Sequence, residues 1–225
     1  MEARPDLLRP TAPSAASGLL LLADIGGYTS FLRSVQDAHQ DDAFADGAVP
    51  PAYSLVSSLL DAIIEAVVPP FTLSKLEGDA VFAWGRDDGR LPRGAALLDC
   101  LSACYAAFRT RLGDAHQVWT CRCDACARVD ALDLKFVLHS GSFVIQSIAG
   151  NAELIGSDVV MAHRLLKTGA SALVGHGAYA LITDGTARRF DIPTEGSQPF
   201  VETYEHYAPI EMHVFSLRES GDAAR

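Results

Sequence analysis

Two aspartates stand where strands are expected to end, and they could do chemistry together. Asp24 closes the apolar run that begins at Leu19, and a Gly26-Gly27 turn follows it. Asp79 lies in the tight turn Glu77-Gly78-Asp79 between two apolar stretches. An acid at such a position often serves only as a turn or cap residue. Two carboxylates at the ends of neighbouring strands can instead share a pair of divalent ions, and their hard oxygens favour Mg²⁺ or Mn²⁺.

A cysteine cluster is the second group that could do chemistry. Cys121, Cys123 and Cys126 lie close together in a segment expected to be a loop, which could present several sulfurs to one tetrahedral zinc ion. The cluster lacks a fourth ligand, for which His116 is the nearest candidate and Cys100 the next. Structural zinc, reduced thiols and a redox switch all remain open.

Composition restricts the class of protein. The chain has 225 residues with 28 acidic and 18 basic side chains, so its formal charge of -10 should repel nucleic acid and anionic membranes. The apolar runs are too short to span a membrane and no signal-peptide core is evident. Five cysteines, an odd number, argue against a disulfide framework. We therefore expect a cytoplasmic protein that binds neither nucleic acid nor membranes.

The spacing of apolar residues predicts the elements that must position these groups. We expect a buried central strand at 19–24, then a short helix that Thr29 or Ser30 caps and that carries Phe31 and Val35. The other predicted elements are helices at 53–68, 92–112 and 157–168, hairpins at 71–84 and 132–148, the latter with a turn at Ser140-Gly141, and strands at 178–183 and 211–217.

This order of elements predicts an α+β fold. Hairpins interleaved with helices suggest a mostly antiparallel sheet with helices on one side, close to the ferredoxin-like βαββαβ arrangement. We expect one domain at 18–217 with a Cys-rich loop at about 116–128, preceded by a flexible arm at 1–17 and followed by a tail at 218–225.

Three segments in order resemble the catalytic domain of class III nucleotidyl cyclases. They are ADIGGYT at 23–29, KLEGDAV at 75–81 and LIGSDVVMAHRL at 154–165. LHSG at 138–141 also resembles the strand and turn that the family has between its second and third segments. The likeness extends loosely from about residue 18 to 217, and it implies the class III cyclase fold and a homodimer.

The resemblance also implies roles for individual residues. Asp24 and Asp79 match the two metal aspartates of the family, with the carbonyl of Ile25 as a further ligand, for two Mg²⁺ or Mn²⁺ ions. Lys75 matches the lysine that reads adenine, and Glu153 falls where an aspartate is common. A cationic donor beside a carboxylate acceptor suits adenine better than guanine, which favours ATP over GTP. Lys75 and Glu153 as ordinary solvated charges are the alternative.

The departures from the family pattern concern catalysis. The family helix carries an asparagine four residues before an arginine, whereas this chain has Val160 before Arg164. Loss of one positioned donor commonly costs about 10² to 10³ in rate, so a slow or inactive enzyme is expected. His163 is turned away from that face and should be a surface residue. The turn His206-Tyr207-Ala208-Pro209 lacks the lysine that often grips the terminal phosphates.

Three functions follow as hypotheses. The first is a homodimeric phosphorus-oxygen lyase that converts ATP to 3′,5′-cyclic AMP and pyrophosphate, with Arg164 as a catalytic group. The second is a catalytically degenerate cyclase-fold module that binds nucleotide or acts as a regulatory partner. The third, a zinc-stabilised interaction domain, rests only on the cysteines.

Overall fold

The apolar run that ends at Asp24 lies within a long strand, β1 (Ser14–Gly26), of the computed structural model. The structure describes residues 12–39, 49, 51–118, 121 and 123–218. Leu19 and Leu21 face one core and Leu20 and Leu22 the other, and all four are fully buried. Each buried leucine contributes about 1.5 to 3 kcal/mol, so β1 anchors both faces of the sheet.

Within the described residues, eight strands form one sheet in the order β2-β3-β1-β4-β6-β8-β7, with β5 paired to β4 beside this path. The neighbouring strands are antiparallel except β4 and β6, which confirms the predicted α+β class with a mostly antiparallel sheet. The strand of Asp24, β1, thus pairs with β3, the strand that follows the predicted hairpin turn. The bounds are β2 (Thr72–Glu77), β3 (Ala80–Arg86), β4 (Asp133–Ile148), β5 (Asn151–Ile155), β6 (Tyr179–Thr183), β7 (Gln198–Glu202) and β8 (Ile210–Ser216).

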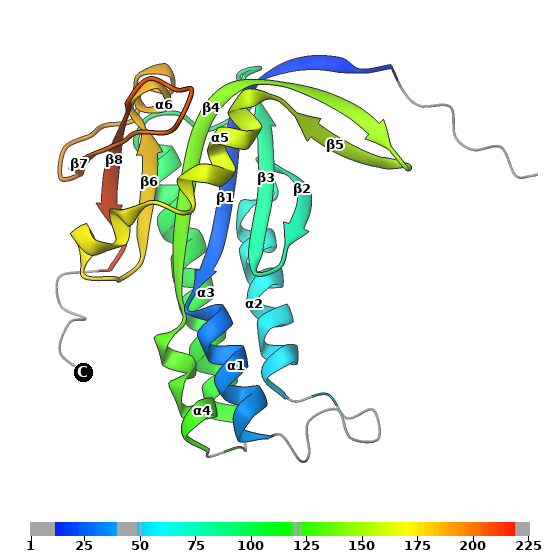
Figure 1. Cartoon of the computed structure of the whole chain (residues 1–225), viewed down its shortest axis with the longest axis vertical. Helices are drawn as coiled ribbons and strands as arrows, with labels where there is room; N and C mark the ends of the chain where they lie inside the picture. Colours follow the sequence, from blue (N-terminus) through cyan, green and yellow to red (C-terminus); the bar gives the residue numbers. More distant parts are fainter. Residues whose placement is uncertain (1–11, 40–48, 50, 119–120, 122, 219–225) are drawn as a thin grey trace, which may run out of the picture.

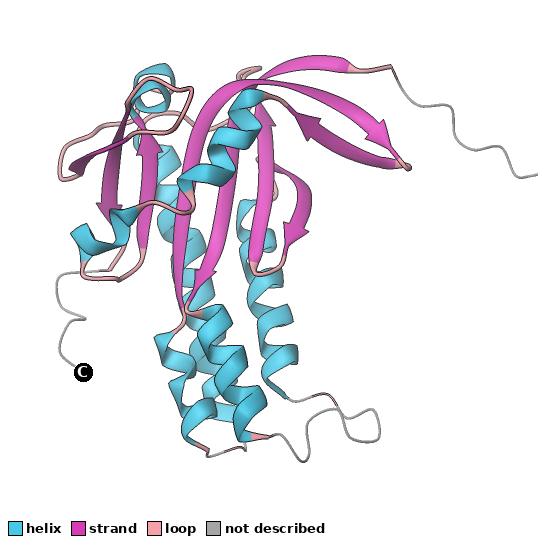
Figure 2. Ribbon diagram, in the orientation of Figure 1, coloured by secondary structure: helices cyan, strands magenta, loops and turns pink. Residues whose placement is uncertain are grey.

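Helices cover both faces of the sheet, so the expectation of helices on one side was wrong (Figure 2). α1 (Tyr28–Ala38), α2 (Pro51–Val67) and α3 (Ala95–Val118) contribute to the core that contains Leu19, while α5 (Ser157–Leu165) packs on the face of Leu20 (Figure 1). Apolar side chains on both sides of β1 require such double cover. The short helices are α4 (Asp124–Ala127), η2 (Arg128–Ala131), η3 (Gly169–Val174) and α6 (Asp184–Arg189).

The predicted hairpin with a turn at Ser140-Gly141 was wrong, because β4 runs unbroken from Asp133 to Ile148. Its partner in the hairpin is β5, which the sequence patterns did not indicate. Gly141 serves close packing rather than a turn: a Cβ there would lie 2.2 Å from Cγ of Asp158. The Asp158 carboxylate accepts a 2.7 Å hydrogen bond from the Ser142 N–H and fixes the start of α5 on β4.

Helix ends also differ from the predicted ones. Gly27, not Thr29 or Ser30, is the N-cap of α1, with φ of 83° and no side-chain cap bond. Glycine suits this position because left-handed backbone strains other residues. α5 ends at Leu165, three residues before the predicted end. β1 begins at Ser14, within the segment expected to be an arm. No helix in the described ranges has the length and apolar character to cross a bilayer.

Candidate functional site

Asp24 and Asp79 meet at one end of the sheet. Asp24 pairs in register with Ala80, the first residue of β3, and the Ile25 N–H donates a 3.2 Å hydrogen bond to the carbonyl of Asp79. The β2–β3 turn and the end of β1 therefore present two carboxylates next to each other. Their proximity follows from a local hairpin and one strand pairing, both of which apolar side chains determine.

A lysine lies beside this pair of acids. Nζ of Lys135, on β4, lies 2.9 Å from Oδ2 of Asp24, and these side chains are 27% and 16% exposed. Burial raises the pKa of Asp79, and the negative charge of Asp24 raises that pKa further, while Lys135 acts in the opposite direction. Two close carboxylates therefore repel each other at this site, and one ammonium group offsets part of the repulsion.

Two side-chain pairs connect β2 to β5 and to α5. Nζ of Lys75 lies 2.6 Å from Oε2 of Glu153, across β2 and β5. Nε2 of His163, on α5, lies 2.9 Å from Glu77, and its ring meets Phe82 edge-on with centroids 4.8 Å apart. Lys75 and Glu153 of the same chain therefore form an ion pair. His163 is half-buried and bonded rather than free at the surface.

The exposed face of α5 carries Val160 and Arg164, one helical turn apart. Both line a pocket of about 450 Å³ together with Glu77 and Lys167. The Arg164 guanidinium lies 5.5 Å from the centroid of the Tyr207 ring. Tyr207 belongs to the turn that lacks the expected lysine. An aromatic ring therefore contacts the arginine at the position where the resembled family often has a second cation.

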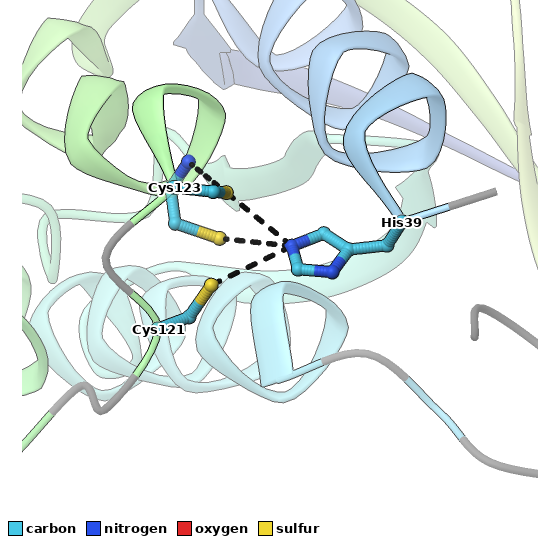
Figure 3. Close-up of side chains that lie close together, drawn as sticks. His39, Cys121 and Cys123 are labelled. Atoms are coloured by element: carbon cyan, nitrogen blue, oxygen red, sulfur yellow. Dashed lines mark hydrogen bonds between the residues drawn. The ribbon is translucent and has the colours of Figure 1, made fainter. Parts of the chain in front are cut away.

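The three clustered cysteines meet an imidazole that the sequence did not indicate. Nε2 of His39, at the end of α1, lies 3.5 Å from Sγ of Cys121 and 3.3 Å from Sγ of Cys123 (Figure 3). The same nitrogen lies 3.7 Å from Sγ of Cys126. Burial alone would raise the pKa of the Cys123 thiol, but hydrogen bonds from Cys126, Cys121 and His39 lower it to about 7.

The other ligand candidates of this cluster lie elsewhere. The side chain of His116 is outside the described residues. Cys104 is fully buried in the core, as its place on an apolar helical stripe predicts. Cys100, also on α3, is half-buried and is not part of the group of four ligands.

The sequence matches a known family over its central part. A family model described as "Protein of unknown function (DUF2652)" matches residues 56–172, just over half of the chain. The chain belongs to the DUF2652 family. A curated relative, the "Uncharacterized protein Rv2561/Rv2562" of Mycobacterium tuberculosis, is 30% identical over 166 residues, which cover 73% of this chain and 74% of the relative.

Solved cyclase structures share the fold of this DUF2652 chain. The guanylyl cyclase Cya2 superposes with a TM-score of 0.61 at 13% identity, covering 94% of this chain and 98% of its own. A class III adenylyl cyclase-like ATP-binding protein from Pseudomonas aeruginosa has a TM-score of 0.57 at 14% identity, covering 84% of this chain and 37% of its own. The chain therefore has the class III nucleotidyl cyclase fold, which confirms the resemblance at the level of fold.

The acids of this DUF2652 chain suit a hard divalent cation. Asp24 and Asp79 offer carboxylate oxygens, which Mg²⁺ and Mn²⁺ prefer. Burial and the negative charge of Asp24 both raise the pKa of Asp79, and a cation between the two carboxylates would offset their repulsion. Lys135 already satisfies one oxygen of Asp24, so a metal ion would compete with its ammonium group. The donor set fits the ion, but with a built-in competitor.

Sequence reasoning missed two residues that the structure brings to these groups. Lys135 lies directly opposite Asp24 in the β1–β4 register, and in the sequence it is one of several polar residues of β4, with no signal of its own. His39 comes from a helix more than eighty positions before the cysteines, with no local signal. Residue spacing could not predict either contact, because strand register and helix packing create them.

Proposed function

We propose that this chain is a nucleotidyl cyclase-like protein that converts ATP into 3′,5′-cyclic AMP and pyrophosphate. The observation that carries the proposal is the meeting of Asp24 and Asp79 at one sheet end. The Lys75–Glu153 pair on the same sheet adds a second group that suits a nucleotide. These features occur together on a fold shared with solved cyclases.

Asp24, Asp79 and the carbonyl of Ile25 would hold the divalent ions. When bound, two Mg²⁺ or Mn²⁺ ions supply charge stabilisation for the attacking 3′ oxygen and the leaving pyrophosphate. The chain's own cations do the remaining electrostatic work. The Arg164 guanidinium can donate to phosphate oxygens from the face of α5, where Lys167 lines the same pocket.

Lys75 and Glu153 are suited to recognise the base. Their 2.6 Å contact holds a donor and an acceptor close together before any ligand arrives. The Lys75 ammonium can donate to N1 of adenine, while the Glu153 carboxylate accepts from the 6-amino group. Guanine presents the reversed pattern at these positions, so the pair favours ATP.

A homodimer would complete the site, because in the resembled family the metal aspartates of one subunit face the base-reading and arginine positions of the other. The surface supports such an association. Large apolar side chains are exposed at Ile148 and Ile155 on the β4–β5 hairpin, which projects from the body, and at Leu76 on β2 (Figure 1). The cytoplasm, which supplies both ATP and a reducing environment for the free thiols, is the proposed compartment.

A nucleotide-binding or regulatory module without catalysis is the second candidate, and two observations favour it. Val160 places an apolar side chain, 49% exposed, where the resembled helix has an amide donor. Lys135 occupies an oxygen of Asp24 that a metal ion would need. One solved relative in fold is itself described as an ATP-binding protein.

Product formation separates the two candidates. Purified protein is incubated with each of four nucleoside triphosphates and Mn²⁺, and cyclic product and pyrophosphate are measured by mass spectrometry. The Asp24→Ala variant should abolish product, whereas Asp88→Ala, which removes an acid paired with exposed Arg90, should not. Absence of product above the Asp24→Ala level with every triphosphate would refute the cyclase, and calorimetric binding of ATP would then support the module.

A further inference from the structure

The unassigned group of His39 and three cysteines has the geometry of a metal site. The ligand atoms of the four residues all lie within 4.8 Å of one another. A tetrahedral zinc ion with Zn–S of about 2.3 Å and Zn–N of about 2.0 Å requires N···S separations of about 3.5 Å. The separations from Nε2 of His39 to the three sulfurs, 3.3 to 3.7 Å, agree with this value.

Hydrogen bonding alone does not account for this arrangement. One imidazole nitrogen carries at most one proton, so it can donate to one sulfur at a time, yet three sulfurs surround it at similar distances. A cation at the centre would contact all four atoms at once. The Cys126 N–H also points to Sγ of Cys123 at 3.4 Å, which is the kind of outer-shell bond that steadies a metal thiolate.

The positions of the four residues indicate what the ion would do. His39 lies at the end of α1, the helix that follows Asp24, while the cysteines lie in the connection from α3 to β4, the strand of Lys135. α1 and α4 lie side by side at the end of the sheet (Figure 1). Four protein ligands leave no open position for a substrate, so the site is structural.

We propose that His39, Cys121, Cys123 and Cys126 bind one structural Zn²⁺ that ties α1 to the segment preceding β4. A ligand set of three thiolates and one imidazole selects zinc over hard cations such as Mg²⁺. Binding displaces the thiol protons to solvent and involves no oxidation. The ion thereby stabilises both segments that flank the Asp24–Lys135 contact, independently of any nucleotide chemistry.

Metal analysis of the full chain, purified under reducing conditions without chelator, tests the proposal. One equivalent of zinc per chain is expected, and cobalt substitution should give the absorption of tetrahedral thiolate coordination. His39→Ala and Cys121→Ser should each weaken zinc binding by at least about 100-fold, since even outer-shell changes cost 10- to 100-fold. Cys100→Ser, a thiol outside the group, should bind zinc like the wild type.

A titration of the wild-type protein keeps the test independent of whether variants fold. Metal is removed with a chelator under reducing conditions, and zinc is returned in competition with an indicator while the melting temperature is followed. One-to-one binding with a higher melting temperature supports the site. Failure to bind zinc, a disulfide between two of the three cysteines in its place, or full affinity in both ligand variants would overturn it. Asp24→Ala should retain zinc, so this result stands apart from that of the cyclase assay.

Discussion

Replacing Lys135 by methionine should lower the free energy of unfolding of the metal-free protein and raise its affinity for Mn²⁺. Nζ of Lys135 lies 2.9 Å from Oδ2 of Asp24, and the side chains of Lys135 and Asp24 are 27% and 16% exposed. Exposed pairs contribute about 0 to 1 kcal/mol and fully buried pairs cost about 3 to 5 kcal/mol to break, so about 2 kcal/mol suits this half-buried pair. The melting temperature without metal should fall by about 4 to 8 °C.

The same free energy should reappear in metal binding. A cation that takes the Asp24 oxygen must displace Lys135, whereas the Lys135→Met variant has no such competitor. About 2 kcal/mol corresponds to a Kd for Mn²⁺ that is about 30-fold lower. Isothermal titration calorimetry measures this Kd, and denaturation in chelator measures the loss of stability.

Arg90→Met is the matched control, because it removes one positive charge from a side chain that is 89% exposed and lies outside the proposed site. Its Kd for Mn²⁺ should stay within about twofold of the wild type, as for most surface substitutions. An unchanged or higher Kd in a folded Lys135→Met variant would refute the competition and leave Lys135 as a group that only positions Asp24.

Three further predictions concern α5 and the strands beneath it. Gly141→Ala should lower the free energy of unfolding by about 1 to 3 kcal/mol because its Cβ would meet Asp158, whereas Gly113→Ala, with open space around it on α3, should raise it by about 0.5 to 1 kcal/mol; urea unfolding measures both. Val160→Asn should raise the rate of cyclic product formation at least about 10-fold, since a positioned donor is commonly worth about 10² to 10³, and retained ATP binding without faster turnover would contradict the cyclase. Burial lowers the pKa of His139 despite the nearby Asp158 carboxylate, so the folded state binds fewer protons than the unfolded state and stability should fall as pH drops below about 6.5. His139→Gln should remove this pH dependence in urea unfolding, and an unchanged slope would assign it to another group.

Features that depend on neighbours in sequence could be predicted. The apolar run of β1, the Gly78 turn of the β2–β3 hairpin and the apolar stripes of α2 and α3 are local patterns, and each led to the correct element. The motif order led to the correct fold, and Asp24 and Asp79 were placed at strand ends that the structure brings together. Hydrophobic periodicity carries this information because burial on one or two faces imposes it residue by residue.

Features that depend on packing between distant segments could not be predicted. Gly141 has the local appearance of a turn residue, yet β4 continues through it because this position pairs with Gly18 of β1, and α5 approaches it too closely for a side chain. The pairing of Lys135 with Asp24 follows from the β1–β4 register, and a shift by one residue would send that lysine to the other face.

The sequence by itself determined that two acids stand where strands are expected to end and that three thiols share one segment, because both facts are local. Tertiary structure alone decided what stands beside them. Packing brings Lys135 to within 2.9 Å of Asp24 and the His39 imidazole to within 3.7 Å of all three sulfurs. These contacts join residues far apart in the chain, and they exist only because burial of the apolar faces fixes the strand register and the helix positions together.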